Sequence, residues 1–121
     1  MSNPIETFFS AWSETDAIAR HAAVAASFAK NGTYADPRAP EIIIGSKALA
    51  DYVGLFISNA PGWSATVVKS DEVAGVARAT VAFSGKGPDG TDMLQHGQYF
   101  VETEGHTIKR MVGFAGTGAP E

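Results

Sequence analysis

Asp36 has the clearest potential for chemistry, and it stands near the end of the segment Thr33-Tyr34-Ala35-Asp36-Pro37. We predict a short strand here that ends at or near the proline, which cannot donate to a sheet ladder. A carboxylate walled by Trp12, Tyr34 and apolar helix faces would be partly desolvated, and desolvation makes a carboxylate a stronger general base. The alternative interpretation is that Asp-Pro begins a turn whose carboxylate bonds nearby backbone amides.

Three further side chains, Tyr99, Gln95 and Trp12, offer hydrogen-bond donors. One face of a predicted strand over residues 93–103 carries Met93, Gln95, Gly97, Tyr99 and Val101. If that face looks inward, Tyr99 donates a hydrogen bond into a pocket and Gln95 orients a ligand carbonyl; a register shift of one residue would bring His96 inward instead, as an acid or base. Trp12 offers an indole N–H, which donates less strongly than a phenol to a developing oxyanion, or it is an ordinary core tryptophan.

The last predicted strand, residues 107–115, adds Arg110. Arg110 alternates with Ile108, Val112 and Phe114, which we expect to face inward. An inward arginine needs a carboxylate, either Asp36 or an acidic ligand, and pairing with Asp36 would make that residue a weaker base. The alternative is an arginine that extends to solvent at the sheet edge. We predict Asp36, Tyr99 and Trp12 as catalytic residues, with a ligand-binding set made of Tyr34, Phe56, Gln95, Arg110 and Val112.

Three helices are predicted to position these residues. The first begins with Asn3 as N-cap and Pro4 as its first residue, and its apolar stripe is Ile5, Phe8, Phe9 and Trp12. The second spans residues 16–30, with the stripe Ile18, Ala22, Ala25 and Phe28, and Asn31-Gly32 ends it. The third opens at Ser46 and stops at Pro61-Gly62; its stripe is Leu49, Tyr52, Val53, Phe56 and Ile57.

After Gly62 the period of the apolar residues changes to about two, which predicts four strands over residues 63–70, 76–84, 93–103 and 107–115. Their connections are short, as in an antiparallel meander. The pattern predicts an α+β fold in which three N-terminal helices pack on a curved, mainly antiparallel sheet, in the order α-α-β-α-β-β-β-β. A cleft between the concave sheet face and the helices would suit a small ligand. We expect a single domain over residues 1–116 and a flexible tail over 117–121.

Composition excludes several classes of function. The 121 residues include no cysteine, which removes disulfides, thiolate zinc sites and cysteine nucleophiles. The net charge is −4 and the basic residues are scattered, so we expect no nucleic-acid partner. The three histidines are dispersed and show no metal-binding spacing, so we expect no metal. No apolar run reaches the length of a membrane span and no signal layout is visible, so we expect a cytoplasmic protein without a membrane partner.

The order of elements and several segments resemble the nuclear transport factor 2-like superfamily, and most closely its SnoaL-like branch, the relatives of polyketide cyclases and ketosteroid isomerase. The resemblance extends from about Ile5 to Phe114, and the segments that carry it are Phe8–Trp12, Tyr34-Ala35-Asp36-Pro37, Ile44–Leu49, Gly97–Glu102 and Ile108–Phe114. It implies a cone-shaped fold with a deep pocket, commonly a homodimer through the sheet. It also implies action on small, largely apolar or aromatic molecules without metal or organic cofactor.

The resemblance also assigns positions. Asp36 matches the general-base aspartate of ketosteroid isomerase in its Asp-Pro context, and Trp12 stands where that enzyme has the tyrosine of its oxyanion hole. Gly97 occupies the position of the enzyme's second, protonated aspartate, and Tyr99 the position where many SnoaL-like sequences have an aspartate. The chain therefore keeps the position of the base and lacks the acids.

Three hypotheses for function follow. The first is a cofactor-independent isomerase, cyclase or hydrolase-like lyase that uses Asp36 as base on an apolar carbonyl compound. The second is a non-catalytic protein that binds a small apolar metabolite in the same pocket. The third is a dimeric interaction domain, which bulky side chains filling the cleft would favour.

Overall fold

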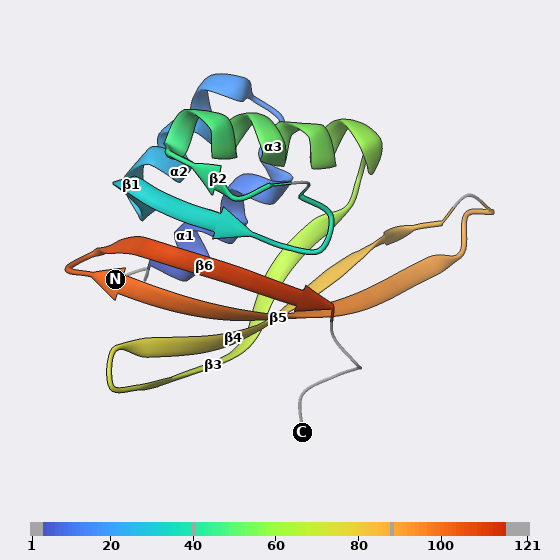
Figure 1. The fold of residues 1–121 in the computed structure, drawn as a ribbon. Coiled ribbons are helices and arrows are strands. Elements are labelled where there is room, and N and C mark those ends of the chain that lie inside the picture. Colours follow the sequence, from blue (N-terminus) through green and yellow to red (C-terminus); the bar gives the residue numbers. More distant parts are fainter. Residues whose placement is uncertain (1–3, 40, 88, 116–121) are drawn as a thin grey trace.

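Helices cover one face of a six-stranded sheet in the computed structural model of the protein, which describes residues 4–39, 41–87 and 89–115 (Figure 1). The helices are α1 (Pro4–Ser10), α2 (Ala17–Ser27) and α3 (Ser46–Asn59), and a 3-10 turn, η1 (Ala11–Ser13), follows α1. The strands are β1 (Phe28–Ala35), β2 (Ile43–Ile44), β3 (Ser64–Val73), β4 (Val76–Lys86), β5 (Asp92–Glu104) and β6 (Thr107–Ala115). The predicted fold class is confirmed, with the two-residue β2 as an addition.

The strand order β2-β1-β6-β5-β4-β3 brings distant segments together. β1 pairs in parallel with β6, and the other neighbours are antiparallel. Tyr34 lies beside Met111 in this ladder, and Tyr99 lies beside Gly113. The end of β1, where Asp36 follows, is therefore two strands away from the middle of β5.

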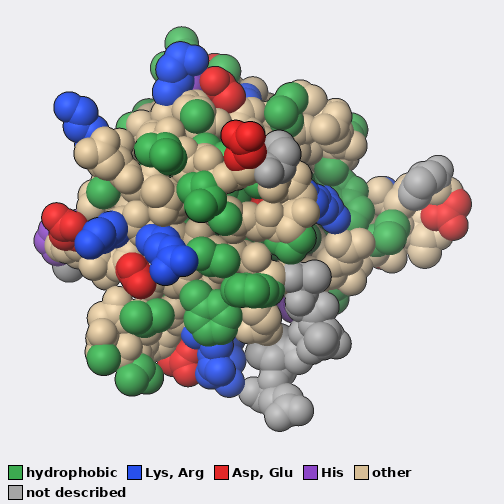
Figure 2. All heavy atoms as spheres, in the orientation of Figure 1, with side chains coloured by type: hydrophobic (Ala, Val, Ile, Leu, Met, Phe, Trp, Pro, Cys, Tyr) green, Lys and Arg blue, Asp and Glu red, His purple; other side chains and the backbone are tan. Residues whose placement is uncertain are grey.

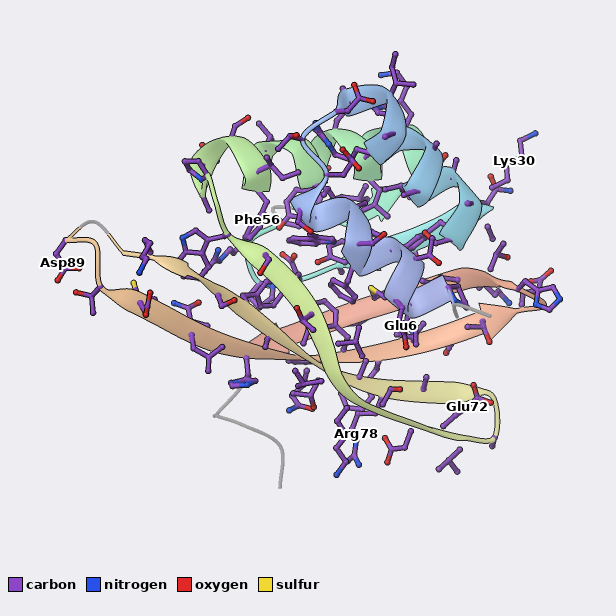
Figure 3. The ribbon with its side chains drawn as sticks, turned by 180° about the vertical axis from the view of Figure 1, so that it is seen from behind. Glu6, Lys30, Phe56, Glu72, Arg78 and Asp89 are labelled. Carbon is purple, nitrogen blue, oxygen red and sulfur yellow. The ribbon has the colours of Figure 1, made fainter. Side chains whose placement is uncertain are left out.

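The apolar stripes of α1 and α3 form the helical side of the core. Ile5, Phe8, Phe9 and Trp12 are buried as the period predicts. On α3, Leu49 and Val53 are fully buried, while Tyr52 and Phe56 are partly buried and pack against the core. Figure 3 shows the labelled Phe56 extending from α3 into the space between the helices and the sheet.

The boundaries and the stripe predicted for α2 are wrong. The helix ends at Ser27, whose hydroxyl donates to the carbonyl oxygens of Ala23 and Val24, and Phe28 already belongs to β1. Phe28 turns into the core as a strand residue and contacts the Phe8 ring at a centroid distance of 4.9 Å, which explains the early change of structure. Val24 and Ser27 are the buried residues of the helix, whereas the predicted stripe members Ile18, Ala22 and Ala25 are exposed.

The hairpins are longer than predicted, although the bounds of β6 are as expected. β3 and β4 are joined by Ala74 and Gly75, both with positive φ, a two-residue turn that matches the right-handed twist of the strands. The β4–β5 hairpin projects beyond the helices, with Asp89 near its tip (Figure 3). The predicted N-cap Asn3 and the predicted flexible tail lie outside the described residues.

Hydrophobic side chains also lie on the side of the sheet that the helices leave uncovered. Figure 2 shows a group of them over β5 and β6, where the exposed Phe100 and Phe114 pack edge to face at 5.8 Å. The homodimer expected through the sheet would use this face, and it stays a prediction. None of the described helices is both long enough and apolar enough to cross a membrane.

Candidate functional site

A cavity of about 1080 Å³ lies between α3, the turn after β1 and the open end of the β4–β5 hairpin. A volume of this size accommodates a drug-sized molecule. Aromatic residues form much of its wall, and they come from η1, α3, β4, β5 and β6 and from the residue before β3: Trp12, Tyr52, Phe56, Trp63, Phe83, Tyr99 and Phe114. The third hypothesis, an interaction domain, would be favoured by bulky side chains that fill the cleft. The cleft is open, so this observation does not support it.

Asp36 is on this wall and is also the acceptor of a dense hydrogen-bond array. Its Oδ1 accepts from the backbone N–H groups of Arg38 and Ala39, each at 2.8 Å, as the turn interpretation requires. Its Oδ2 accepts from the Tyr34 hydroxyl at 2.6 Å. The Tyr52 hydroxyl lies 2.8 Å from Oδ1 and 2.9 Å from Oδ2, so it is shared between the two oxygens. Asp36 therefore lies on the cavity wall, as the first interpretation expects, and also bonds nearby backbone amides, as the turn interpretation expects.

The tyrosines of the site are held in their neutral form. Burial, together with the nearby Tyr99 and Asp36, raises the pKa of Tyr34 well above its ordinary value. Burial and the hydrogen bond to Asp36 raise the pKa of Tyr52. Burial also raises the pKa of Tyr99, against the opposing influence of Tyr34 and of the Arg38 charge. All three phenols are therefore hydrogen-bond donors rather than bases at neutral pH.

Trp12 belongs to the core and to the cavity wall at once. Its side chain is 3% exposed, and its ring meets Phe56 edge to face at 4.9 Å. The indole Nε1 is buried and has no hydrogen-bond partner among the described residues. An unsatisfied buried donor costs about 1–3 kcal/mol, so a ligand acceptor that reached this N–H after a small ring movement would bind favourably.

On β5, burial agrees with the inward register. Gly97, Tyr99 and Val101 are buried, whereas Phe100 between them is exposed. Gly97 leaves little free space: a Cβ there would lie 3.1 Å from the Tyr99 ring and 3.2 Å from the Phe83 ring. His96 is half-buried and lines the cavity as well, as does the exposed Gln95, so both of the alternative polar residues are at the wall.

The predicted inward direction of Arg110 is wrong, and Val112 is not part of the described cavity lining. The β5–β6 ladder changes register between Glu102, which pairs with Arg110, and Thr103, which pairs with Ile108. This irregularity breaks the alternation, so the buried residues between positions 107 and 114 of β6 are Ile108, Met111 and Gly113. Arg110 is exposed, and its guanidinium lies 3.8 Å from the Glu102 carboxylate rather than near Asp36.

The sequence prediction missed two residues of the site, Tyr52 and Arg38. Tyr52 was placed only on the apolar stripe of its helix, yet a tyrosine in such a stripe needs a partner for its hydroxyl, and this requirement was the available signal. Arg38 follows the Asp-Pro pair directly, and the available signal for it was the turn interpretation, in which the Asp36 carboxylate bonds nearby backbone amides. Of the predicted ligand-binding residues, Phe56 and Gln95 line the cavity, and Tyr34 lies behind Asp36 as its buried donor.

Comparison with known proteins identifies the fold. No family model matches the chain, and no curated protein matches it. A candidate isomerase of the SnoaL-like family from Agrobacterium tumefaciens is 24% identical, with a TM-score of 0.78 over 93% of this chain and 94% of the other. The chain has the nuclear transport factor 2-like fold.

Two further solved structures share this fold. A protein from Catenulispora acidiphila with a ketosteroid isomerase-like fold, in complex with trimethylamine, is 16% identical, with a TM-score of 0.77 over 94% of this chain and 85% of the other. An LEH-like epoxide hydrolase from M. tuberculosis is 12% identical, with a TM-score of 0.68 over 93% of this chain and 80% of the other. At these identities the likeness shows the fold alone. Within the described part of the chain, no three His, Asp or Glu side chains gather as metal ligands would.

Proposed function

We propose that the protein binds a small, largely apolar carbonyl compound in the cavity and moves a proton within it, with Asp36 as the general base. The observation that carries this proposal is the position of Asp36: a carboxylate on the wall of an aromatic cavity, with a donor beside it that a ligand can take over. Structures of the same fold include a candidate isomerase and an LEH-like epoxide hydrolase, which supports small-molecule chemistry in such a cavity.

Tyr52 is the donor that makes the base available. It has one hydroxyl proton shared between two acceptor oxygens, and it lies half-buried on the cavity wall. Tyr34 is fully buried, and the donors from Arg38 and Ala39 are backbone groups, so these partners of Asp36 stay in place. A ligand carbonyl that accepts the hydrogen bond of the Tyr52 hydroxyl therefore frees a lone pair on Asp36 Oδ2.

The reaction then needs no group beyond the chain and its ligand. A C–H bond beside the ligand carbonyl breaks, its proton goes to Asp36 Oδ2, and the electron pair moves to the carbonyl oxygen. Tyr52 donates to that oxygen as its negative charge develops, and a neutral phenol is suited to this role. The carboxylic acid formed at Asp36 returns the proton to the same or another carbon, so the sum is an exchange or an isomerisation.

The aromatic wall supplies the surroundings that this step requires. Phe56, Phe83 and Trp63 exclude water from the ligand body, and a drier site strengthens the interaction between the Tyr52 hydroxyl and the developing charge. Trp12 adds an unsatisfied N–H that a second acceptor on the ligand can use.

The test is deuterium exchange at the carbon next to the carbonyl. The protein is incubated with 1-tetralone and with a steroid-like enone in D₂O, and loss of the C–H signal is followed by NMR. We expect exchange above the buffer rate, reduced by about 10²–10⁴-fold in Asp36→Asn, the range typical of a general base. Tyr52→Phe should slow exchange less than Asp36→Asn, because it removes the donor and retains the base. Unchanged exchange in Asp36→Asn would rule out this role.

A second candidate function is binding without turnover, and the same carboxylate supports it. Asp36 accepts from two backbone amides and from Tyr34 in addition to Tyr52, and a carboxylate so well supplied with donors has little spare acceptor capacity. Under this alternative a ketone stabilises the protein in a thermal-shift assay but shows no exchange. Asp36→Asn would then lower the melting temperature of the free protein and leave its affinity for the ketone nearly unchanged.

A further inference from the structure

The lining of the cavity does not share the acidic balance of the chain as a whole. The chain carries 13 acidic and 9 basic residues, a net charge of −4. The ionisable side chains of the described lining, tyrosines aside, are Asp36, Arg38, Lys86 and His96. Lys86 is paired with Asp92, so Arg38 and His96 face one acid, Asp36, whose oxygens are already occupied by donors. This balance favours a ligand that brings a negative charge.

Arg38 is the cation best placed to receive that charge. Lys86 forms an ion pair with Asp92, whereas no described carboxylate lies within ion-pair distance of the Arg38 guanidinium. Arg38 is exposed and lines the cavity, so its side chain stands at the rim. Its charge also acts inside the cavity, where it opposes the burial that raises the pKa of Tyr52 and Tyr99.

Arg38 and the proposed base are parts of one short turn. The N–H groups of Arg38 and Ala39 donate to Asp36 Oδ1 at 2.8 Å, and the Ala39 N–H also lies 3.2 Å from the Asp36 carbonyl oxygen. Pro37 between them restricts the backbone further. The position of the Arg38 Cα relative to the Asp36 carboxylate is therefore set by the turn, so an anion held by Arg38 would lie within the length of that side chain from the base.

We propose that the ligand of this cavity is a carboxylic acid with an apolar ring system. Its anionic carboxylate binds Arg38 at the rim, and its ring system contacts the aromatic wall near Asp36. This inference rests on the proposed function of the cavity and names its ligand class. A guanidinium forms paired hydrogen bonds with a carboxylate, which suits this end of the ligand. The Asp36 carboxylate repels an anion. The carboxylate of the ligand therefore lies at Arg38, and its ring system lies toward Asp36.

The test compares 2-naphthoate with methyl 2-naphthoate, two probes with the same ring system that differ in charge. Binding is measured by NMR titration at constant ionic strength. We expect the wild-type protein to bind the acid about tenfold more tightly than the ester, which corresponds to about 1.4 kcal/mol. Arg38→Gln should remove this preference and leave the affinity for the ester within about twofold. The matched control is Arg110→Gln, an exposed arginine outside the described lining, which should change neither affinity.

Two results would overturn the inference: equal affinity of the wild-type protein for acid and ester, or an equal loss of acid binding in Arg110→Gln, which would indicate general attraction of anions. If the ester still binds and Asp36-dependent exchange of the ketones persists, the proposed function stands without the carboxylate. If the acid preference depends on Arg38 but no ketone is exchanged, the ligand class stands and proton transfer does not. If neither probe and no ketone binds, both proposals fail.

Discussion

The two ends of the concave sheet face differ in how they are filled. At the packed end, defined by Phe8, Val101, Ile108 and Met111, all four side chains are fully buried. At the open end, defined by Met93, Leu94 and Gln95, the same strand β5 lines the cavity, and Leu94 is 61% exposed. One strand thus serves as core in one half and as cavity wall in the other. The difference shows that the site begins where the helices stop covering the sheet.

A cluster of rings joins the two ends. Phe9 meets Tyr99 at 4.9 Å, and Tyr34 stacks on Tyr99 at 6.5 Å, so the inner wall of the cavity is also the side of the core. The hydroxyl donors of the site are therefore held by ring packing as well as by hydrogen bonds. A close-packed interior limits the movement of such rings, which gives the donors defined positions before a ligand binds.

The largest effect is expected from Phe8→Ala at the packed end. The Phe8 ring is fully buried and packs edge to face with Phe9 and Phe28, each at 4.9 Å. Loss of the ring should lower the free energy of unfolding by about 3–5 kcal/mol, measured by urea denaturation. Leu94→Ala at the open end is the comparison, and it should change the same quantity by no more than about 0.5 kcal/mol. Similar losses from both substitutions would abolish the distinction between the ends.

Alkaline pH should destabilise the protein through its tyrosines. The pKa of each described tyrosine is raised in the folded chain, so an unfolded chain releases these protons first, near pH 10. The contribution to stability is therefore complete below about pH 10 and is lost as the pH rises above it, at up to about 1.4 kcal/mol per pH unit for each of Tyr34 and Tyr99. Phenolate absorbance near 295 nm should rise together with the loss of helical circular dichroism. A gradual phenolate titration of the folded protein would contradict the burial of these hydroxyls.

The position of Tyr99 can be tested through two glycines. A Cβ at Gly113 would lie 2.5 Å from the Tyr99 ring, whereas a Cβ at Gly97 would lie 3.1 Å from it. Gly113→Ala should therefore cost about 1–3 kcal/mol and displace the ring, and Gly97→Ala should cost less. Urea denaturation measures the cost, and near-UV circular dichroism reports the ring environment. The reverse order of the two costs would show that Tyr99 is held from the Gly97 side instead.

The sequence predicted the parts of the fold that depend on local period. α1, α3 and β6 were found because their apolar residues repeat regularly, and α2 failed because Phe28 is apolar in either a helix or a strand. Arg110 was misplaced because a register change is a property of two paired strands, and one strand's alternation cannot show it. The contact between Asp36, which follows β1, and Tyr52 on α3 spans a segment that includes β2, so no spacing rule within a single element predicts it.

The smallest effect is expected at the hairpin that borders the cavity, from Lys86→Gln. Lys86 and Asp92 form an ion pair between exposed side chains, and exposed pairs contribute about 0–1 kcal/mol. The Trp63 indole donates to the Lys86 carbonyl oxygen at 3.2 Å, and this contact involves the backbone, so the substitution leaves it intact. We therefore expect the free energy of unfolding, measured by urea denaturation, to change by less than about 0.5 kcal/mol. The matched control is Arg78→Gln, which breaks the exposed ion pair between Arg78 and Asp71. A clearly larger loss in Lys86→Gln than in the control would mean that charge, rather than the Trp63 contact and the β4–β5 ladder, keeps the open end of the sheet in place.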